Sequence, residues 1–165
     1  MQQIIFSHGK ESGPWGSKIQ AMADLARDSG FAVDSIDYQD LKDDPEGRVE
    51  RLGAVVSELE APPVLVGSSM GGYVSAVVSC RFDCAGLFLM APALFISGYE
   101  VQDYPSKAAR VEVVHGWSDT VIPPELSIRF AREANCTVHL VPGDHRLNSS
   151  LPEVLDLFDK FLGRV

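Results

Sequence analysis

The chain has 165 residues, of which 45 % are hydrophobic and 22 % are charged, and its formal net charge is -9. This composition is typical of a soluble globular protein, and the length suits one domain, which we expect to span residues 1–165. No apolar run approaches the roughly 20 residues that a membrane-spanning helix needs, so we expect no membrane insertion. The negative charge and the absence of a basic stripe argue against nucleic acid as a partner.

The N-terminal segment Met1–Phe6 lacks the basic region and the cleavage site of a signal peptide, so we expect a cytoplasmic protein. The cysteines, Cys80, Cys84 and Cys136, are odd in number and contain no Cys-x-x-Cys spacing. This pattern disfavours both a disulfide framework and a zinc site. We therefore predict buried thiols, no metal and no cofactor.

Extended apolar segments alternate with helical patterns along the chain, which is typical of a parallel sheet built from βαβ units. The continuous apolar runs predict strands covered on both faces, whereas the second and last segments carry interleaved polar residues, as expected of sheet edges. The predicted strands are Gln3 to Ser7, Phe31 to Asp37, Val64 to Gly67, Ala85 to Met90, Val111 to His115 and Thr137 to Val141.

Apolar stripes and end signals predict helices between these strands. One helix ends near Gly30, another begins at Asp44-Pro45, a third opens at Pro123-Pro124, and the last begins with a capping box from Ser150 to Glu153. The pattern predicts an α/β fold with a doubly wound, mainly parallel six-stranded sheet and helices on both faces. Edge strands two and six suit the order 2-1-3-4-5-6, which places a site between strands one and three.

The segment Gly67-Ser68-Ser69-Met70-Gly71 joins the third strand to a helix. A Gly-x-Ser-x-Gly sequence in this setting predicts a sharp turn that lifts the central serine above the sheet, where the flanking positions have no room for a Cβ. Only Ser69 has glycine two residues before and two residues after it. If either serine is a nucleophile, it is Ser69.

Asp119 follows the fifth strand, in His115-Gly116-x-x-Asp119, and His145 follows the sixth, in Gly143-Asp144-His145. Both loops leave the carboxyl edge of the sheet, where Ser69 lies. The three motifs, in the order Ser, Asp, His, resemble the α/β-hydrolase superfamily, in particular its short, lidless esterase or thioesterase members. The resemblance covers essentially the whole chain, although the superfamily's first two strands are missing and residues 91–110 are too few for a cap domain.

The chemistry of a serine hydrolase explains these residue types. His145 would take the proton of the Ser69 hydroxyl and return it to the leaving group, while Asp119 would fix the imidazole tautomer. The backbone N–H of Met70, directly after the nucleophile, would bind the oxyanion. By resemblance, the second donor is the N–H of Lys10 in the loop after the first strand, within the range Gly9 to Ser12.

Other polar residues have simpler interpretations. His8 and His115 each precede a glycine at a strand end, which favours structural residues that bond nearby backbone. His139 lies inside an edge strand. Asp144 competes with Asp119 for the acid role, but a residue next to the histidine can rarely bend back to the Nδ1 atom.

Aromatic residues in loops above the carboxyl edge predict the wall of an acyl pocket, which without a cap would suit short or medium acyl groups. These residues are Trp15, Phe95, Tyr99, Tyr104 and Trp117. The sequence as a whole predicts a serine-dependent hydrolase of a small carboxylic ester or thioester. The alternative is a non-catalytic binding or scaffold protein with the same fold, although no triad residue is lost.

Overall fold

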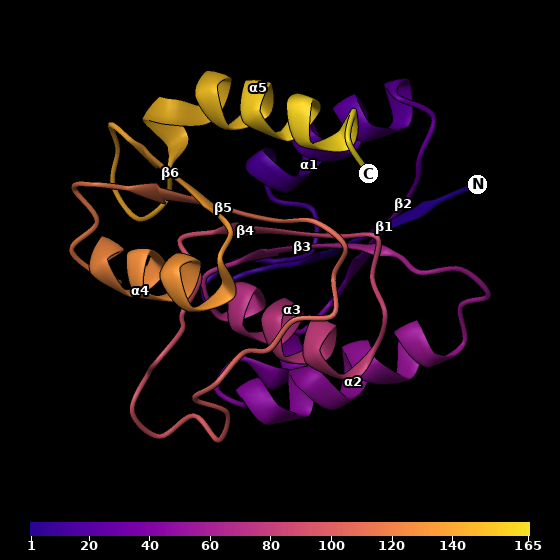
Figure 1. The fold of residues 1–165 in the computed structure, drawn as a ribbon, viewed down its shortest axis with the longest axis horizontal. Coiled ribbons are helices and arrows are strands. Elements are labelled where there is room, and N and C mark those ends of the chain that lie inside the picture. Colours follow the sequence, from indigo (N-terminus) through magenta and orange to yellow (C-terminus); the bar gives the residue numbers. More distant parts are fainter.

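The computed structural model describes all 165 residues, which form one parallel sheet of six strands in the order β2-β1-β3-β4-β5-β6 (Figure 1). This is the predicted doubly wound order, and β1 lies between β2 and β3, so the chain reverses direction across the sheet there. The strands are β1 (Gln3–Ser7), β2 (Ala32–Ile36), β3 (Val64–Ser68), β4 (Gly86–Met90), β5 (Val111–Gly116) and β6 (Thr137–Val141).

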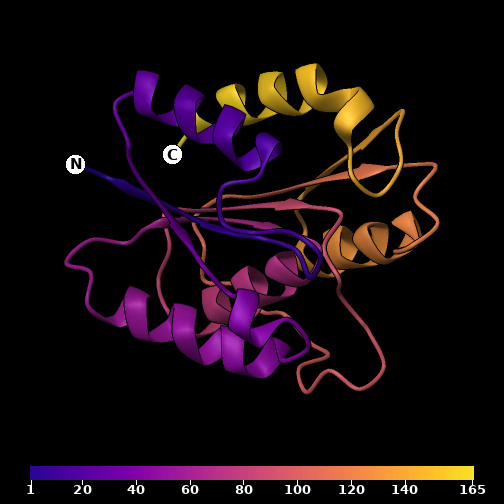
Figure 2. The same ribbon diagram turned by 180° about the vertical axis from the view of Figure 1, so that it is seen from behind.

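Helices cover both faces of the sheet, as the alternation of apolar segments predicted. Figures 1 and 2 show α1 (Ser17–Asp28) and α5 (Leu151–Leu162) together on one face. The opposite face carries α2 (Pro45–Ser57), α3 (Met70–Arg81) and α4 (Pro124–Ala134). Short 3-10 helices, η1 (Gln39–Leu41) and η2 (Asn148–Ser150), precede α2 and α5. No helix is both long and apolar enough to cross a bilayer.

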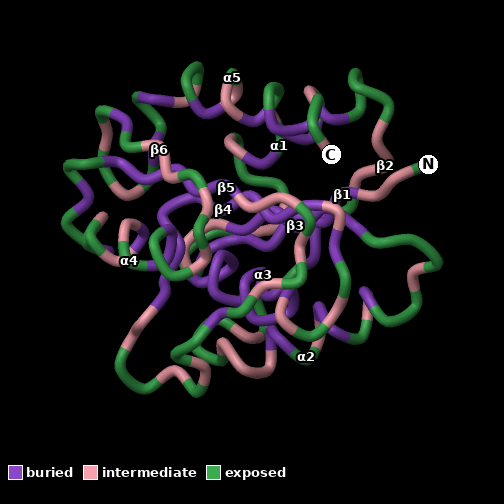
Figure 3. Tube along the Cα trace, viewed as in Figure 1, coloured by how far each residue is buried: buried purple, intermediate pink, exposed green.

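Alternate residues of each central strand enter two separate cores, one on each face of the sheet. Ile5 and Leu65 pack in the core beneath α2, α3 and α4, whereas Phe6 and Val66 pack in the core beneath α1 and α5. Phe6 and Val66 also face each other across the register between β1 and β3. Figure 3 shows the buried residues concentrated along these strands. The two cores hold the carboxyl ends of the strands in fixed positions.

The edge strands and two of the helix ends agree with the predictions. Strands β2 and β6 terminate the sheet and carry partly exposed residues. The carboxylate of Asp44 accepts the Gly47 N–H at 2.8 Å and caps α2. Gly30 follows the last residues of α1 with φ of +90°, a conformation that glycine adopts without strain.

The predicted capping box of the last helix is wrong. Ser150 directly precedes α5, but its side chain makes no capping hydrogen bond. The reason is that η2 leads straight into α5, so Ser150 has φ of -108° and ψ of 15° instead of the extended conformation that a capping serine needs.

The connection from β4 to β5, residues 91–110, contains no helix and crosses the α3 side of the sheet as ordered irregular chain. Buried tyrosine hydroxyls hold it in place. Tyr104 accepts the Phe95 N–H at 3.1 Å and donates to the Val101 carbonyl at 2.9 Å. Tyr73 of α3 accepts the Val101 N–H at 3.1 Å. The connection is therefore tied to the fold and forms no cap above the carboxyl edge.

Candidate active site

Ser69 lies at the turn between β3 and α3 in a left-handed conformation with φ of 54° and ψ of -119°. A non-glycine residue rarely adopts such a conformation unless the surrounding structure enforces it. Gly71 is in contact with β1, and a Cβ on it would overlap the carbonyl oxygen of Ser7. A Cβ on Gly67 would overlap the backbone of Gly71. Both glycines are therefore required by the close approach of backbone, as the sequence predicted.

Replacement of Gly71 by alanine is expected to lower the free energy of unfolding by about 3 kcal/mol, because the new methyl group meets rigid backbone. The matched control is Gly53→Ala in the middle of α2, where the nearest atom, on Phe82, is 3.7 Å from the new Cβ. This control is expected to be neutral or to stabilise by up to about 1 kcal/mol through helix propensity. Urea unfolding of both variants checks the difference, and equal stabilities would contradict the packing argument.

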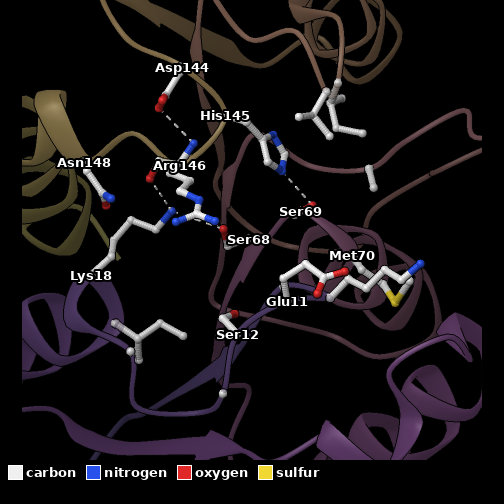
Figure 4. Close-up of a pocket in the computed structure, with 18 of the residues that line it drawn as sticks. Glu11, Ser12, Lys18, Ser68, Ser69, Met70, Asp144, His145, Arg146 and Asn148 are labelled. Carbon is white, nitrogen blue, oxygen red and sulfur yellow. Dashed lines mark hydrogen bonds between the residues drawn. The ribbon is translucent and has the colours of Figure 1, made fainter.

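A continuous chain of hydrogen bonds joins the three residues singled out in the sequence (Figure 4 shows its first step). His145 Nε2 lies 3.0 Å from Ser69 Oγ, and His145 Nδ1 lies 2.7 Å from Asp119 Oδ2. The carboxylate requires a proton on Nδ1, so Nε2 is free to accept the Ser69 hydroxyl proton. The loops after β5 and β6 therefore bring Asp119 and His145 to the serine at the end of β3.

Asp119 is buried, which disfavours its ionised form, but hydrogen bonds from His145 and from the backbone N–H groups of Ile122 and Val121 outweigh this cost. Together they hold the pKa of the Asp119 carboxyl below its usual value. The two backbone donors contact Oδ1 at 2.8 and 2.9 Å, which leaves Oδ2 for histidine. Asp119 is therefore fixed as a carboxylate.

His115 also contacts the Asp119 carboxylate, which the sequence interpretation did not anticipate. Its Nε2 lies 3.0 Å from Asp119 Oδ2 and 2.9 Å from the Ile122 carbonyl, so the Nε2 proton is shared between two acceptors. Its Nδ1 then accepts the Ser127 hydroxyl at 2.6 Å. Burial lowers the pKa of His115, which favours this neutral form. The expectation of a backbone-bonding residue is thus correct for the Ile122 contact but incomplete.

Asp144, the competing carboxylate, accepts the backbone N–H of Arg146 at 3.1 Å and that of Leu147 at 3.3 Å. It makes no hydrogen bond to His145. The carboxylate therefore shapes the turn that follows β6, and the imidazole is held by Asp119.

The two backbone donors proposed for the oxyanion have no competing acceptor. Met70 is the first residue of α3, so its N–H has no partner within the helix. The N–H of Lys10 likewise forms no hydrogen bond. The loop that carries Lys10 passes close to Ser69, since a Cβ on Gly9 would lie 3.5 Å from the Ser69 Cβ.

The carbonyl oxygen of Gly9 faces the protein interior. His8 Nδ1 donates to it at 2.7 Å, while His8 Nε2 accepts the Tyr38 N–H at 2.9 Å. The guanidinium of Arg48 lies 3.4 Å from the same oxygen and donates to the His8 carbonyl at 2.8 Å. Because the N–H and C=O of a trans peptide point in opposite directions, the Lys10 N–H points away from the interior.

Arg48 is fully buried on α2 and forms no ion pair. Its Nε donates to the Leu41 carbonyl at 2.9 Å, and its guanidinium lies 5.1 Å from the centre of the Tyr38 ring. The sequence analysis missed this residue. The available signal was its position one turn before Leu52, on the apolar face of the helix.

Ser69 and His145 line a cavity of about 680 Å³. Its walls come from the β1–α1 loop, the start of α1, the elbow and the loops after β4, β5 and β6. Of the aromatic residues predicted to line a pocket, Tyr99 does so, together with Ile96 and the aliphatic residues Val121 and Ile122. No group of His, Cys, Asp or Glu side chains is arranged to hold a metal ion.

The other predicted pocket aromatics do not line this cavity. Trp117 is 57 % exposed, and Trp15 is 43 % exposed with Arg27 over its ring. Phe95 packs against the guanidinium of Arg129, 3.8 Å from the ring centre, and Tyr104 is buried in the core. Of the five aromatic residues predicted to wall the pocket, only Tyr99 therefore lines the cavity, while the other four are exposed or pack elsewhere.

Comparison with known proteins defines the family. Residues 3–107 match the uncharacterised protein family UPF0227. A candidate hydrolase of the alpha/beta superfamily from Xanthomonas campestris is 31 % identical, with a TM-score of 0.90 over 100 % of both chains. The chain therefore belongs to the α/β-hydrolase superfamily and, within it, to UPF0227. No curated protein matches the sequence.

More distant solved structures share the fold. Est1E from Butyrivibrio proteoclasticus, solved with ferulic acid bound, is 18 % identical with a TM-score of 0.81, covering 98 % of this chain and 88 % of its own. A monoacylglycerol lipase from Paleococcus ferrophilus is 15 % identical with a TM-score of 0.71, covering 96 % of this chain and 94 % of its own. Together with the candidate hydrolase from Xanthomonas campestris, these neighbours support a hydrolase function for this chain.

Proposed function

We propose that this chain is a serine hydrolase that cleaves a carboxylic ester or thioester through an acyl-Ser69 intermediate. The observation that carries the proposal is the hydrogen-bonded chain from Ser69 through His145 to Asp119, with 3.0 Å and 2.7 Å between the paired atoms. This chain opens into a cavity that also contains Met70 and Lys10. Nucleophile, base and orienting acid are the parts that acyl transfer requires.

In the first step, Ser69 Oγ attacks the carbonyl carbon of the substrate and its proton passes to His145 Nε2. The carbonyl oxygen becomes an oxyanion, which accepts hydrogen bonds from the N–H groups of Met70 and Lys10. Collapse of the tetrahedral intermediate breaks the bond to the alcohol or thiol, which leaves with the proton from His145. Water then attacks the acyl-serine with the same base, releases the acid and restores Ser69.

The absence of a cap over the cavity favours short or medium acyl groups, since a long chain would extend into solvent. Est1E carries ferulic acid in its solved structure, and the lipase from Paleococcus ferrophilus is named for monoacylglycerols. These names agree with a small ester as substrate.

The test is intact-mass analysis after exposure to a fluorophosphonate probe, which phosphonylates activated serines. One adduct is expected on the unmodified protein, and none on Ser69→Ala or on the heat-denatured protein. Ser68→Ala is the matched control and should still be labelled, because Ser68 does not contact His145. An adduct that persists in Ser69→Ala and disappears in Ser68→Ala would contradict the proposed nucleophile. No adduct on folded protein would favour the non-catalytic alternative.

A further inference from the structure

One wall of the cavity carries two cationic side chains that form no ion pair. Most Lys and Arg side chains of this acidic protein pair with a carboxylate, including Lys10 with Asp43 at 2.8 Å. Lys18 and Arg146 both line the cavity, and neither pairs with a carboxylate. Figure 4 shows them on the Ser68 side of the Ser69–His145 pair. A polar wall with unpaired positive charge beside a nucleophile favours an anionic group on the bound molecule.

Lys18 Nζ donates only to uncharged oxygens in the structure. It lies 3.3 Å from Ser68 Oγ and 3.1 Å from the Arg146 carbonyl. Burial lowers the pKa of Lys18 to about 8, although the negative charge of Asp144 opposes the change. The ammonium group has therefore lost part of its hydration without gaining a charged partner. An anion bound next to it would supply that partner.

The start of α1 adds to the positive potential of the same wall. Gly16, Ser17, Lys18 and Ile19 all line the cavity, and Gly16 provides no side-chain cap. The first turn contains no acidic residue, so the free N–H groups of the helix N-terminus keep their partial positive charge. Backbone donors and an ammonium group thus converge from one element on one side of the cavity.

A carboxylate fits this wall better than a doubly charged phosphate. Asp144 also lines the cavity, and its Oδ1 is occupied by two backbone N–H groups. The negative charge of Asp144 reduces the excess positive charge on the wall, and it would repel a dianion more strongly than a monoanion. The other acidic residue of the lining, Glu11, pairs with Lys42 at 3.1 Å and lies near Met70, away from Lys18, in Figure 4.

We propose that Lys18 and Arg146, with the N-terminus of α1, form a subsite for a carboxylate on the substrate. The preferred substrate is then a half-ester or half-thioester of a short dicarboxylic acid, or a molecule in which a free carboxylate lies a few bonds from the ester. The assignment deepens the proposed function and rests on it, since the substrate carboxylate would bind in the same cavity as Ser69.

Binding to the Ser69→Ala protein tests the subsite without turnover. Monomethyl adipate and methyl hexanoate have equally long chains and differ only in carboxylate against methyl at the far end. Calorimetry should show that the anionic ester binds about 10- to 100-fold more tightly, as expected for a charge-assisted hydrogen bond. The added variant Lys18→Met should reduce that preference by at least about tenfold, whereas Lys18→Arg should retain most of it.

The matched control is Lys160→Met, which removes a lysine that pairs with Asp156 on the exposed side of α5. It should leave the preference unchanged. Arg146→Met provides a second, exposed position at which folding is not at risk, and it should also weaken the preference. Circular dichroism of each variant identifies any loss of fold. Equal binding of the two esters, or a preference that survives both Lys18→Met and Arg146→Met, would overturn the subsite.

Turnover of the same two esters by the unmodified protein separates the subsite from the proposed function. Hydrolysis of both at equal kcat/KM would overturn the subsite and leave the hydrolase. Binding of monomethyl adipate that depends on Lys18, without hydrolysis of any ester or labelling of Ser69, would overturn the hydrolase and leave the anion site. If the protein hydrolyses both esters and its preference for the anionic ester requires Lys18, the result supports both the hydrolase function and the carboxylate subsite.

The preference should also decline with pH. Lys18 is charged below its pKa of about 8 and loses its proton above it, so the anionic ester should lose the part of its advantage that depends on Lys18 between about pH 8 and 10. The other charged or titratable residues that line the cavity are Lys10, Glu11, Tyr99, Asp144, His145 and Arg146. A preference constant to pH 10 would contradict the role of Lys18.

Discussion

If the proposed function is correct, replacement of His145 by alanine is expected to lower kcat by about 10⁶-fold, by analogy with the triad histidine of a characterised serine protease. Without the imidazole, the Ser69 hydroxyl keeps its proton at neutral pH and the leaving group departs without one. The other imidazole that contacts Asp119, His115, is buried and shares its Nε2 proton between Asp119 and Ile122, so it cannot take over the role. Initial rates with a short-chain 4-nitrophenyl ester check this prediction.

The matched control is His139→Ala. His139 is bonded to Glu112 at 2.9 Å on the edge strand β6, outside the cavity. Its removal should leave kcat within about twofold, since surface substitutions rarely change more than local stability. A comparable loss of kcat in both variants would point to damage of the fold. Retention of most activity in His145→Ala would show that another group acts as the base.

Asp119→Asn is expected to lower kcat by about 10⁴-fold, the scale seen when an amide replaces the triad carboxylate of a serine protease. The amide nitrogen of Asn would face His145 Nδ1 as a donor and favour the wrong tautomer. It would also disturb the second contact, from His115, because both imidazoles meet the same Oδ2 atom at 2.7 and 3.0 Å. The variant should therefore lose stability as well as activity.

Asp144→Asn is the matched control for Asp119→Asn. The amide oxygen of Asn can still accept the Arg146 and Leu147 N–H groups, so the turn after β6 should persist. We expect a loss of kcat of less than about tenfold. Kinetics of both variants on one ester, with thermal unfolding of each, decide the assignment. If Asp144→Asn were the more damaging change, Asp119 would not be the acid of the triad.

The fold could be predicted from the sequence because parallel strands buried on both faces leave a plain signature. Val64-Leu65-Val66 is continuously apolar since each residue enters one of two cores, whereas β2 and β6 have an open side and tolerate polar residues. Helix ends were predictable where a residue is needed for its backbone geometry, as at Gly30 and Pro124. The capping box predicted at Ser150 was wrong because the 3-10 turn that ends at this residue, which has no strong sequence signal, changes its conformation.

The positions of Ser69, Asp119 and His145 were predictable because each follows a strand and the carboxyl ends of parallel strands meet. Contacts between loops could not be predicted from the sequence. Trp15 and Phe95 each had an arginine within reach, and those contacts draw the rings away from the cavity. Lys18 reads in the sequence as an ordinary surface lysine of an amphipathic helix. Its partial burial depends on Arg146, which is 128 residues further along the chain.

The buried guanidinium of Arg48 has a consequence for the electric field in the site. Burial lowers the pKa of the Arg48 guanidinium, but an arginine starts from so high a value that the group stays protonated at neutral pH. It lies behind the Gly9–Lys10 peptide, whose N–H is the proposed second donor to the oxyanion, so its charge would polarise that donor in the favourable direction. This contribution requires no proton transfer and no rearrangement. Oxyanion stabilisation should therefore be constant with pH, and the pH dependence of the rate should come from other groups in the cavity.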